Sequence, residues 1–222
     1  MIIRAKKLVS YFYPITMEKS DGEILPYIEV VINNGKYEMN GSLVNYSYGS
    51  LHTLFDSVFD SYHITDKKIE SALIFGFGAG NIASIITKSI NPGCKITGIE
   101  NDSKILEYAN TYFNLKNFKN LDLVKEDAFK FAHECSAKFD LIVIDLFVEN
   151  RVPIKAKQIE FLSELKKALR LNGSIFFNKI TDTEETKGEG KKLMENMQHI
   201  FGPISQYKQV INGIENSIFV HV

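Results

Sequence analysis

The chain has 222 residues, which is long enough for one α/β domain of ordinary size with a small additional segment, and too short for two such domains. Its 26 basic and 27 acidic residues leave no basic excess, so neither nucleic acid nor an anionic membrane surface is expected as a partner. The two isolated cysteines and the scattered histidines predict no disulfide and no metal site, and the lack of a signal or membrane-spanning segment predicts a cytoplasmic protein.

Residues 1–48 are expected to form a β-rich segment, because short β-prone runs alternate there with turn residues. The dipeptide Asn34-Gly35 separates two of these runs and is a strong signal for a tight β-hairpin. The sequence therefore predicts a small antiparallel sheet at the N-terminus. Its expected strands span residues 8–13, 27–32 and 36–39.

A connecting helix and linker are expected over residues 49–70, because apolar residues recur there at the three- and four-residue spacing of a helix with one buried face. From residue 71 to residue 222, short apolar runs alternate with helical patterns, which predicts a parallel sheet covered by crossover helices. The expected strands are 72–75, 95–99, 121–124, 141–144 and 174–177. The expected helices are 82–90, 103–113, 159–169 and 184–200, and a closing hairpin is expected from 206–211 and 217–222.

The most informative stretch is a glycine-rich turn between the first of these strands and the helix that follows it, Gly76-Phe77-Gly78-Ala79-Gly80. Glycine lets the backbone turn sharply there and approach a ligand near a helix N-terminus. A dinucleotide-binding fingerprint would place its third glycine at position 81, which is Asn81 in this chain. The spacing therefore favours an S-adenosylmethionine site over a dinucleotide site.

Acidic residues follow three successive strands of the expected sheet. Glu100 ends the second strand, where its carboxylate can accept hydrogen bonds from both hydroxyls of a ribose. Asp127 follows the third strand and can accept one from an adenine amino group, and Asp145 ends the fourth strand, facing the reacting end of the ligand. Because open α/β sheets bind ligands outside the carboxyl ends of their strands, this pattern predicts a nucleoside site. The plainer alternative is that Glu100 and Asp127 only cap the following helices.

These residues resemble a known family. The glycine turn, Glu100-Asn101, Asp127-Ala128 and Asp145 are similar to the motifs of class I S-adenosylmethionine-dependent transferases. Within that superfamily, the N-terminal sheet, the turn containing Tyr48 and the proline-containing loop that runs from Asp145 to Pro153 resemble the spermidine synthase branch. The resemblance implies a Rossmann-like α/β fold with a seven-stranded mixed sheet, often in a homodimer, and decarboxylated S-adenosylmethionine as an aminopropyl donor.

The resemblance also implies roles for individual residues. Asp145 would be the base or the orienting carboxylate, Tyr48 would position the substrate amine, and the loop of residues 147–153 would close over the site. The residues that it implies for cofactor binding are Gly76, Phe77, Gly78, Ala79, Gly80, Glu100, Asn101, Asp127, Ala128 and Asp145.

The chain departs from the aminopropyltransferase pattern in its acidic residues. Those enzymes usually carry a second aspartate three positions after the catalytic one, followed by proline, where this chain has Val148 and Glu149. The acidic pair that usually precedes the tyrosine is replaced by Asn45-Tyr46-Ser47. Three interpretations therefore stay open. They are transfer of an aminopropyl or other alkyl group to a small amine, methyl transfer from S-adenosylmethionine itself to a small molecule, and a catalytically degenerate nucleoside-binding domain.

Overall fold

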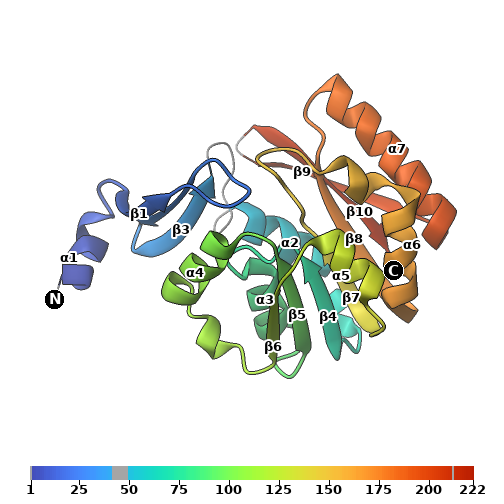
Figure 1. Cartoon of the computed structure of the whole chain (residues 1–222), viewed down its shortest axis with the longest axis horizontal. Coiled ribbons are helices and arrows are strands. Elements are labelled where there is room, and N and C mark those ends of the chain that lie inside the picture. Colours follow the sequence, from blue (N-terminus) through green and yellow to red (C-terminus); the bar gives the residue numbers. More distant parts are fainter. Residues whose placement is uncertain (1, 42–49, 212) are drawn as a thin grey trace.

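The computed structural model of the protein describes residues 2–41, 50–211 and 213–222, which form a large sheet between layers of helices and a small sheet beside it (Figure 1). The strands are β1 (Ile15–Ser20), β2 (Ile28–Asn33), β3 (Lys36–Gly41), β4 (Ser71–Phe75), β5 (Lys95–Glu100), β6 (Leu121–Lys125), β7 (Phe139–Ile144), β8 (Leu169–Ile180), β9 (Ser205–Ile211) and β10 (Ile214–His221). The α-helices are α1 (Ile2–Val9), α2 (Ser50–Ser61), α3 (Asn81–Ile85), α4 (Ser103–Tyr112), α5 (Ala128–Glu134), α6 (Ile159–Ala168) and α7 (Glu184–Phe201). Shorter helical segments are η1 (Ile64–Asp66), η2 (Ile86–Ile90), η3 (Leu115–Asn117) and η4 (Ile154–Lys157).

The large sheet has seven strands in the order β6-β5-β4-β7-β8-β10-β9. The first five strands in this order, from β6 through β5, β4 and β7 to β8, are parallel to one another. Strand β10 runs antiparallel to both β8 and β9. After β4 the chain adds β5 and β6 on one side and then β7 and β8 on the other, so the order reverses between β4 and β7. A crevice for ligands forms at such a switch point. The expected Rossmann-like seven-stranded mixed sheet is confirmed.

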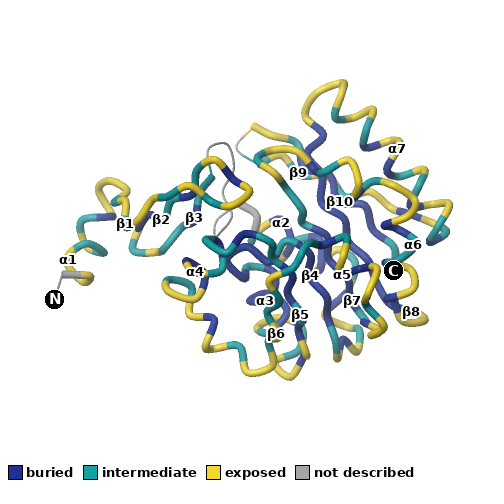
Figure 2. The backbone as a smooth tube through the Cα atoms, in the orientation of Figure 1, coloured by how far each residue is buried: buried dark blue, intermediate teal, exposed yellow. Residues whose placement is uncertain are grey.

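The alternation of side chains along the strands divides the core into two parts. In β4, Ala72 and Ile74 face the layer made by α2, α3 and α4, whereas Leu73 and Phe75 face the layer made by α5, α6 and α7. All four side chains are fully buried, as expected for a parallel strand covered on both faces. Figure 2 shows the central strands buried and the outer sides of the helices exposed.

The small sheet has the order β1-β2-β3 and confirms the hairpin at Asn34-Gly35, where both residues have a positive φ. The strand expected at residues 8–13 is wrong. Helix α1 ends there at Val9, and Ser10 then binds the hairpin turn: its carbonyl accepts the N–H of Asn34 and its hydroxyl accepts the N–H of Gly35. Because these groups of Ser10 are used by the turn, the segment does not continue as a strand, and the first strand of the sheet is β1.

The other expected elements lie at their predicted positions and differ in extent. The last strand, expected at 217–222, begins three residues earlier, at Ile214. The strand expected at 174–177 is the centre of the longer β8, which has pairing partners on both sides in β7 and β10. The helix expected at 82–90 is α-helical only to Ile85 and continues as the π-helical turn η2. Along the described residues, no helix combines the length and the apolar character needed to cross a membrane.

Candidate active site

A cavity of about 420 Å³ lies at the carboxyl ends of the parallel strands, across the switch point between β4 and β7. Residues that directly follow β4, β5, β6 and β7 line it together with residues of β8, β10 and the loop between β1 and β2. The sequence-predicted residues that line it are Gly76, Phe77, Gly78, Glu100, Asn101, Asp127, Ala128 and Asp145. Ala79 and Gly80 complete the turn without lining the cavity, and Tyr48 lies outside the described residues.

The glycine-rich turn needs glycine for two physical reasons. Gly76 has a φ of 79°, and a Cβ at this position would overlap the backbone carbonyl of Asp145. Gly80, with a φ of 83°, is the N-cap residue of α3. The turn is held to β5 by hydrogen bonds of 3.0 Å from the N–H groups of Gly76 and Phe77 to the carbonyl of Ile99. The close approach of the turn to β7 therefore depends on the absence of a side chain at Gly76.

The carboxylate of Glu100 binds the backbone around the cavity. It accepts hydrogen bonds from the N–H groups of Gly78 (3.1 Å), Asn101 (2.9 Å) and Asp102 (3.1 Å). Burial raises the pKa of Glu100, while these three donors act in the opposite direction. A carboxylate offers about four acceptor positions, so this geometry leaves room for a hydroxyl of a ligand.

Asp127 is the N-cap residue of α5, as the plainer interpretation of the sequence proposed. Its Oδ1 accepts the backbone N–H groups of Phe129 and Lys130, each at 3.0 Å. Because both of these bonds go to Oδ1, the second oxygen is the one available to a ligand. Capping and ligand binding are therefore compatible at this residue.

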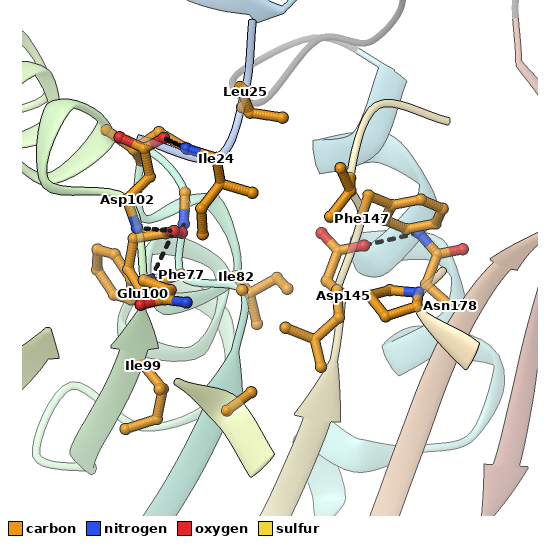
Figure 3. Close-up of a pocket in the computed structure, with 18 of the residues that line it drawn as sticks. Ile24, Leu25, Phe77, Ile82, Ile99, Glu100, Asp102, Asp145, Phe147 and Asn178 are labelled. Atoms are coloured by element: carbon orange, nitrogen blue, oxygen red, sulfur yellow. Dashed lines mark hydrogen bonds between the residues drawn. The ribbon is translucent and has the colours of Figure 1, made fainter. Parts of the chain in front are cut away.

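Asp145 lies on the other side of the cavity from Glu100. Figure 3 shows Glu100 and Asp102 on one side, Asp145 and Asn178 on the other, and Ile82 between them. The amide Nδ2 of Asn178 donates a hydrogen bond of 2.8 Å to Oδ1 of Asp145. Burial raises the pKa of Asp145 to about 6, and the bond from Asn178 opposes this rise. A carboxylate with this pKa can accept a proton near neutral pH.

Two parts of the site are not predicted by the sequence analysis. Asn178 lies in β8 and its Oδ1 is buried without a hydrogen-bond partner among the described residues. Its place directly after the apolar run Ile175-Phe176-Phe177 is the signal that could have identified it. The loop between β1 and β2 brings Ile24 and Leu25 over the cavity, and the N–H of Ile24 donates to Oδ2 of Asp102 at 3.0 Å. Oδ1 of Asp102 meanwhile caps α4 at the N–H of Lys104.

The loop of residues 147–153 also borders the cavity, through Phe147, Val148 and Pro153. Its chain turns back on itself, because Val148 and Arg151 exchange two backbone hydrogen bonds, and Glu149 between them has a φ of 56°. Glu149 is absent from the described residues that line the cavity. The loop therefore reaches the cavity through apolar side chains.

A group of charged side chains supports β8 from the face opposite to the cavity. The carboxylate oxygen Oε2 of Glu189 in α7 accepts hydrogen bonds of 2.7 Å from both Lys179 in β8 and Lys157 in η4. Lys179 is buried. Although burial acts to raise it, the two lysines lower the pKa of Glu189 to about 2. The carboxylate is therefore ionised at neutral pH and joins three separate elements.

The described residues contain no group of three or more His, Cys, Asp and Glu side chains placed to hold a metal ion. A family model described as a methyltransferase domain matches residues 67–216. The chain belongs to this methyltransferase-domain family. The matched range begins before β4 and ends within β10, so it includes six strands of the large sheet and the start of the seventh. Most residues that line the cavity lie in this range, while Ile24, Leu25 and Phe55 lie outside it.

Relatives of this methyltransferase-domain chain include a polyamine aminopropyltransferase from Thermoplasma volcanium, 29% identical over 51% of this chain and 42% of that protein. An eEF1A lysine and N-terminal methyltransferase homolog from Drosophila melanogaster is 24% identical over 63% of this chain and 21% of that protein. The match thus spans less than half of the length of either relative. The resemblance to class I S-adenosylmethionine-dependent transferases of the spermidine synthase branch is confirmed.

Solved structures share the fold. A probable spermidine synthase from Corynebacterium glutamicum superposes with a TM-score of 0.75 at 16% identity, covering 91% of this chain and 78% of that one. Human methyltransferase-like protein 13 in complex with SAH gives a TM-score of 0.63 at 17% identity, covering 78% of this chain and 82% of that one. At these identities the likeness concerns the fold alone.

Proposed function

We propose that the protein is a transferase that binds S-adenosylmethionine or its decarboxylated form in this cavity and moves an aminopropyl or other alkyl group to a small amine. The observation that carries the proposal is the half-buried carboxylate of Asp145 beside Asn178, on the other side of the cavity from Glu100. A nucleophilic amine has to lose a proton when it is alkylated, and Asp145 is a base suited to accept it. Relatives named polyamine aminopropyltransferase support this reaction.

The donor would lie along the carboxyl ends of the strands. Glu100 would accept a hydrogen bond from a ribose hydroxyl and Asp127 one from the adenine amino group. Gly76 and Gly78 would let the backbone of the turn approach the ligand. The sulfonium end would then point to Asp145. The apolar side chain of Ile82 lies along this path and that of Phe147 lies beside Asp145 at its end, so both would exclude water from the reacting carbon.

The reaction needs little covalent chemistry from the protein. The amine lone pair attacks a carbon bound to the sulfonium sulfur, the carbon–sulfur bond breaks, and its electron pair stays on the sulfur, which becomes neutral. The proton released from the nitrogen moves to the carboxylate of Asp145. The protein contributes alignment and a base, which are the terms that dominate such transfers. We place Tyr48 and the loop of residues 147–153 in this proposal as the parts that position the amine and cover it.

A second candidate is methyl transfer from intact S-adenosylmethionine. The side-chain amide of Asn81 lies at the cavity, at the start of α3, and both of its polar atoms are buried without a partner among the described residues. An amide offers one acceptor and one donor group, which are the partners that an ammonium and a carboxylate need. That pair occurs in the amino-acid end of intact S-adenosylmethionine, and the decarboxylated form lacks the carboxylate. The Drosophila relatives named as methyltransferases favour the same alternative.

Calorimetric titration with the two donors separates these candidates. Tighter binding of the decarboxylated donor supports aminopropyl transfer, and tighter binding of the intact donor supports methyl transfer. Mass spectrometry of amines incubated with protein and donor then reports which group is transferred. Donor binding without transfer to any amine would indicate the degenerate domain, and binding of neither donor would overturn the proposal.

A further inference from the structure

The side of the cavity beyond Asp145 differs in chemistry from the side that faces Glu100. We call this side the acceptor wall, and its members are Phe147, Val148, Ile180, Ile211 and Ile214. Val148 and Ile214 are 41% and 37% exposed, so the wall reaches solvent at the mouth of the cavity. These residues come from the loop after β7 and from the ends of β8, β9 and β10. Non-adjacent segments therefore combine to build one apolar surface.

Three polar side chains among the described residues line the cavity beside the acceptor wall, and of these only Asp145 can carry a charge. Two are the neutral amides of Asn178 and Asn216, and the Nδ2 of Asn216 is used by the carbonyl of Ile214 at 3.3 Å. Among the described lining residues, Asp145 has the only carboxylate on this side. The others, Glu100, Asp102, Glu126 and Asp127, lie at or just after the ends of β5 and β6. Residues 42–49, Ser-Leu-Val-Asn-Tyr-Ser-Tyr-Gly, contain no acidic residue either.

Three carboxylates on the elements around the wall have cationic partners. Glu189 accepts hydrogen bonds from two lysines, Glu215 pairs with Lys208 at 3.0 Å, and Glu185 pairs with Arg151. None of the three lines the cavity in the described part of the chain. A second ammonium group on the acceptor would therefore meet isoleucine and valine side chains, and leaving an unpaired charge in such surroundings is costly.

We propose that the acceptor is a primary monoamine with an apolar tail, and not a diamine. This inference rests on the proposed function, because it names the substrate class of the same site. The amine nitrogen lies at Asp145, and the hydrocarbon tail covers the acceptor wall, which removes apolar surface of both partners from water. In the transfer, the nitrogen forms the new bond to the carbon of the donor, the carbon–sulfur bond breaks toward sulfur, and the proton goes to Asp145. The product is then a secondary amine that carries the same apolar tail.

The test compares two acceptors of equal length, 1-aminopentane and 1,5-diaminopentane, which differ by the second ammonium group. With whichever donor the protein binds, we expect kcat/KM to be at least tenfold higher for 1-aminopentane than for 1,5-diaminopentane. The difference should lie in a higher KM for the diamine and not in kcat. Equal or better use of the diamine would overturn the inference.

Failure of the proposed function can be told apart from failure of the inference. Calorimetric titration of both amines into protein saturated with 5′-methylthioadenosine measures acceptor binding without turnover. Tighter binding of 1-aminopentane supports the inference even where no group is transferred. Equal binding, tighter binding of the diamine, or no detectable binding of either amine overturns it.

A variant pair tests whether the missing charge decides the preference. Val148→Asp places a carboxylate on the acceptor wall, and Val148→Asn places an uncharged group of nearly the same shape there. We expect Val148→Asp to improve kcat/KM for 1,5-diaminopentane relative to 1-aminopentane by at least tenfold, and Val148→Asn to keep the original preference. The same change of preference in both variants would show that charge is not the cause and would overturn the inference.

Discussion

The amide nitrogen of Asn178 in β8 lies 2.8 Å from a carboxylate oxygen of Asp145, which directly follows β7, and this hydrogen bond stabilises the ionised form of a half-buried acid. Burial alone would raise the pKa of Asp145 further. Asn178 is therefore a positioning residue for Asp145 that also tunes its protonation. The pH dependence of the transfer should report both effects.

We expect the rate of transfer to fall below about pH 6, because Asp145 has a pKa of about 6 and accepts a proton only when ionised. Replacing Asn178 with Leu removes the hydrogen bond, so the acid limb of the kcat/KM profile should move to higher pH. At pH 6 the rate should drop roughly 3- to 10-fold relative to the native protein. The measurement is a pH profile with one amine, in which titration of the amine itself is the same for both proteins.

Asn216→Leu is the control, because the Asn216 amide donates to a backbone carbonyl and not to Asp145. It should leave the position of the acid limb unchanged. If both variants moved the limb equally, the effect would belong to the polarity of the cavity and not to the bond between Asn178 and Asp145.

Asp145→Asn should abolish the acid limb and reduce kcat by about 10²- to 10⁴-fold, the usual contribution of a general base. It should also change stability. The folded-state pKa of about 6 is above the ordinary aspartate pKa of 3.8, so the stabilising contribution of the protonated form is complete below about pH 4 and is lost as the pH rises through 6. At pH 8 the Asn variant should therefore be more stable than the native protein, by about 1–3 kcal/mol. Urea unfolding at pH 8 and pH 4 measures this, and an equal gain at both pH values would contradict the linkage.

Glu100→Gln should weaken donor binding by about 10- to 100-fold, because a side-chain amide cannot accept three backbone N–H donors and a ribose hydroxyl together. Calorimetric titration with the preferred donor measures the change. Glu107→Gln is the matched control, since Glu107 pairs with Lys104 on an exposed helix surface. Unchanged donor affinity in the Glu100 variant would remove this residue from the site.

Gly76→Ala should destabilise the fold by about 2–5 kcal/mol, because the new Cβ would overlap the carbonyl of Asp145 and the φ of 79° is unfavourable for alanine. Gly188→Ala, in helix α7 with open space around it, should instead stabilise the protein by about 0.5–1 kcal/mol. Urea unfolding of the two variants gives both values. If Gly76→Ala did not destabilise the protein, the close approach of Gly76 to the carbonyl of Asp145 would not require glycine.

Asp102→Ser separates the two roles of that carboxylate. Serine is a good N-cap residue, so α4 should persist, but one hydroxyl cannot also bind the N–H of Ile24. We expect hydrogen exchange of the Ile24 amide to accelerate at least tenfold and donor affinity to fall, while overall stability changes by less than about 1 kcal/mol. An unchanged exchange rate at Ile24 would mean that the loop is held over the cavity by other contacts.

The sequence predicts those parts of the site that depend on local signals. The glycine turn, Glu100, Asp127 and Asp145 each follow a short apolar strand, and the strand order then brings them together. Asn178 and Ile24 reach the cavity through long-range contacts, 33 and 78 residues from their partners in the sequence. Nothing in their own segments indicates these partners, because the contacts depend on how β8 pairs and where the small sheet packs.

The N-terminal segment shows a similar limit. Residues 8–13 are rich in residues that favour strands, yet the chain places the end of α1 and a turn there. The hydrogen bonds from Asn34 and Gly35 to Ser10 come from a hairpin more than twenty residues further along the chain. Local preference is outweighed there by a tertiary contact.

The shared carboxylate of Glu189 couples the loop after β7 to the strand that carries Asn178. Lys157 lies just beyond that loop and Lys179 is the residue after Asn178, and both bind the same oxygen. The C-terminal end of the loop and the part of β8 next to Asp145 are therefore both held to α7 through Glu189. Opening of the loop for substrate entry would then pivot near Phe147, so that the mouth of the cavity can widen while the alignment of Asn178 with Asp145 stays fixed.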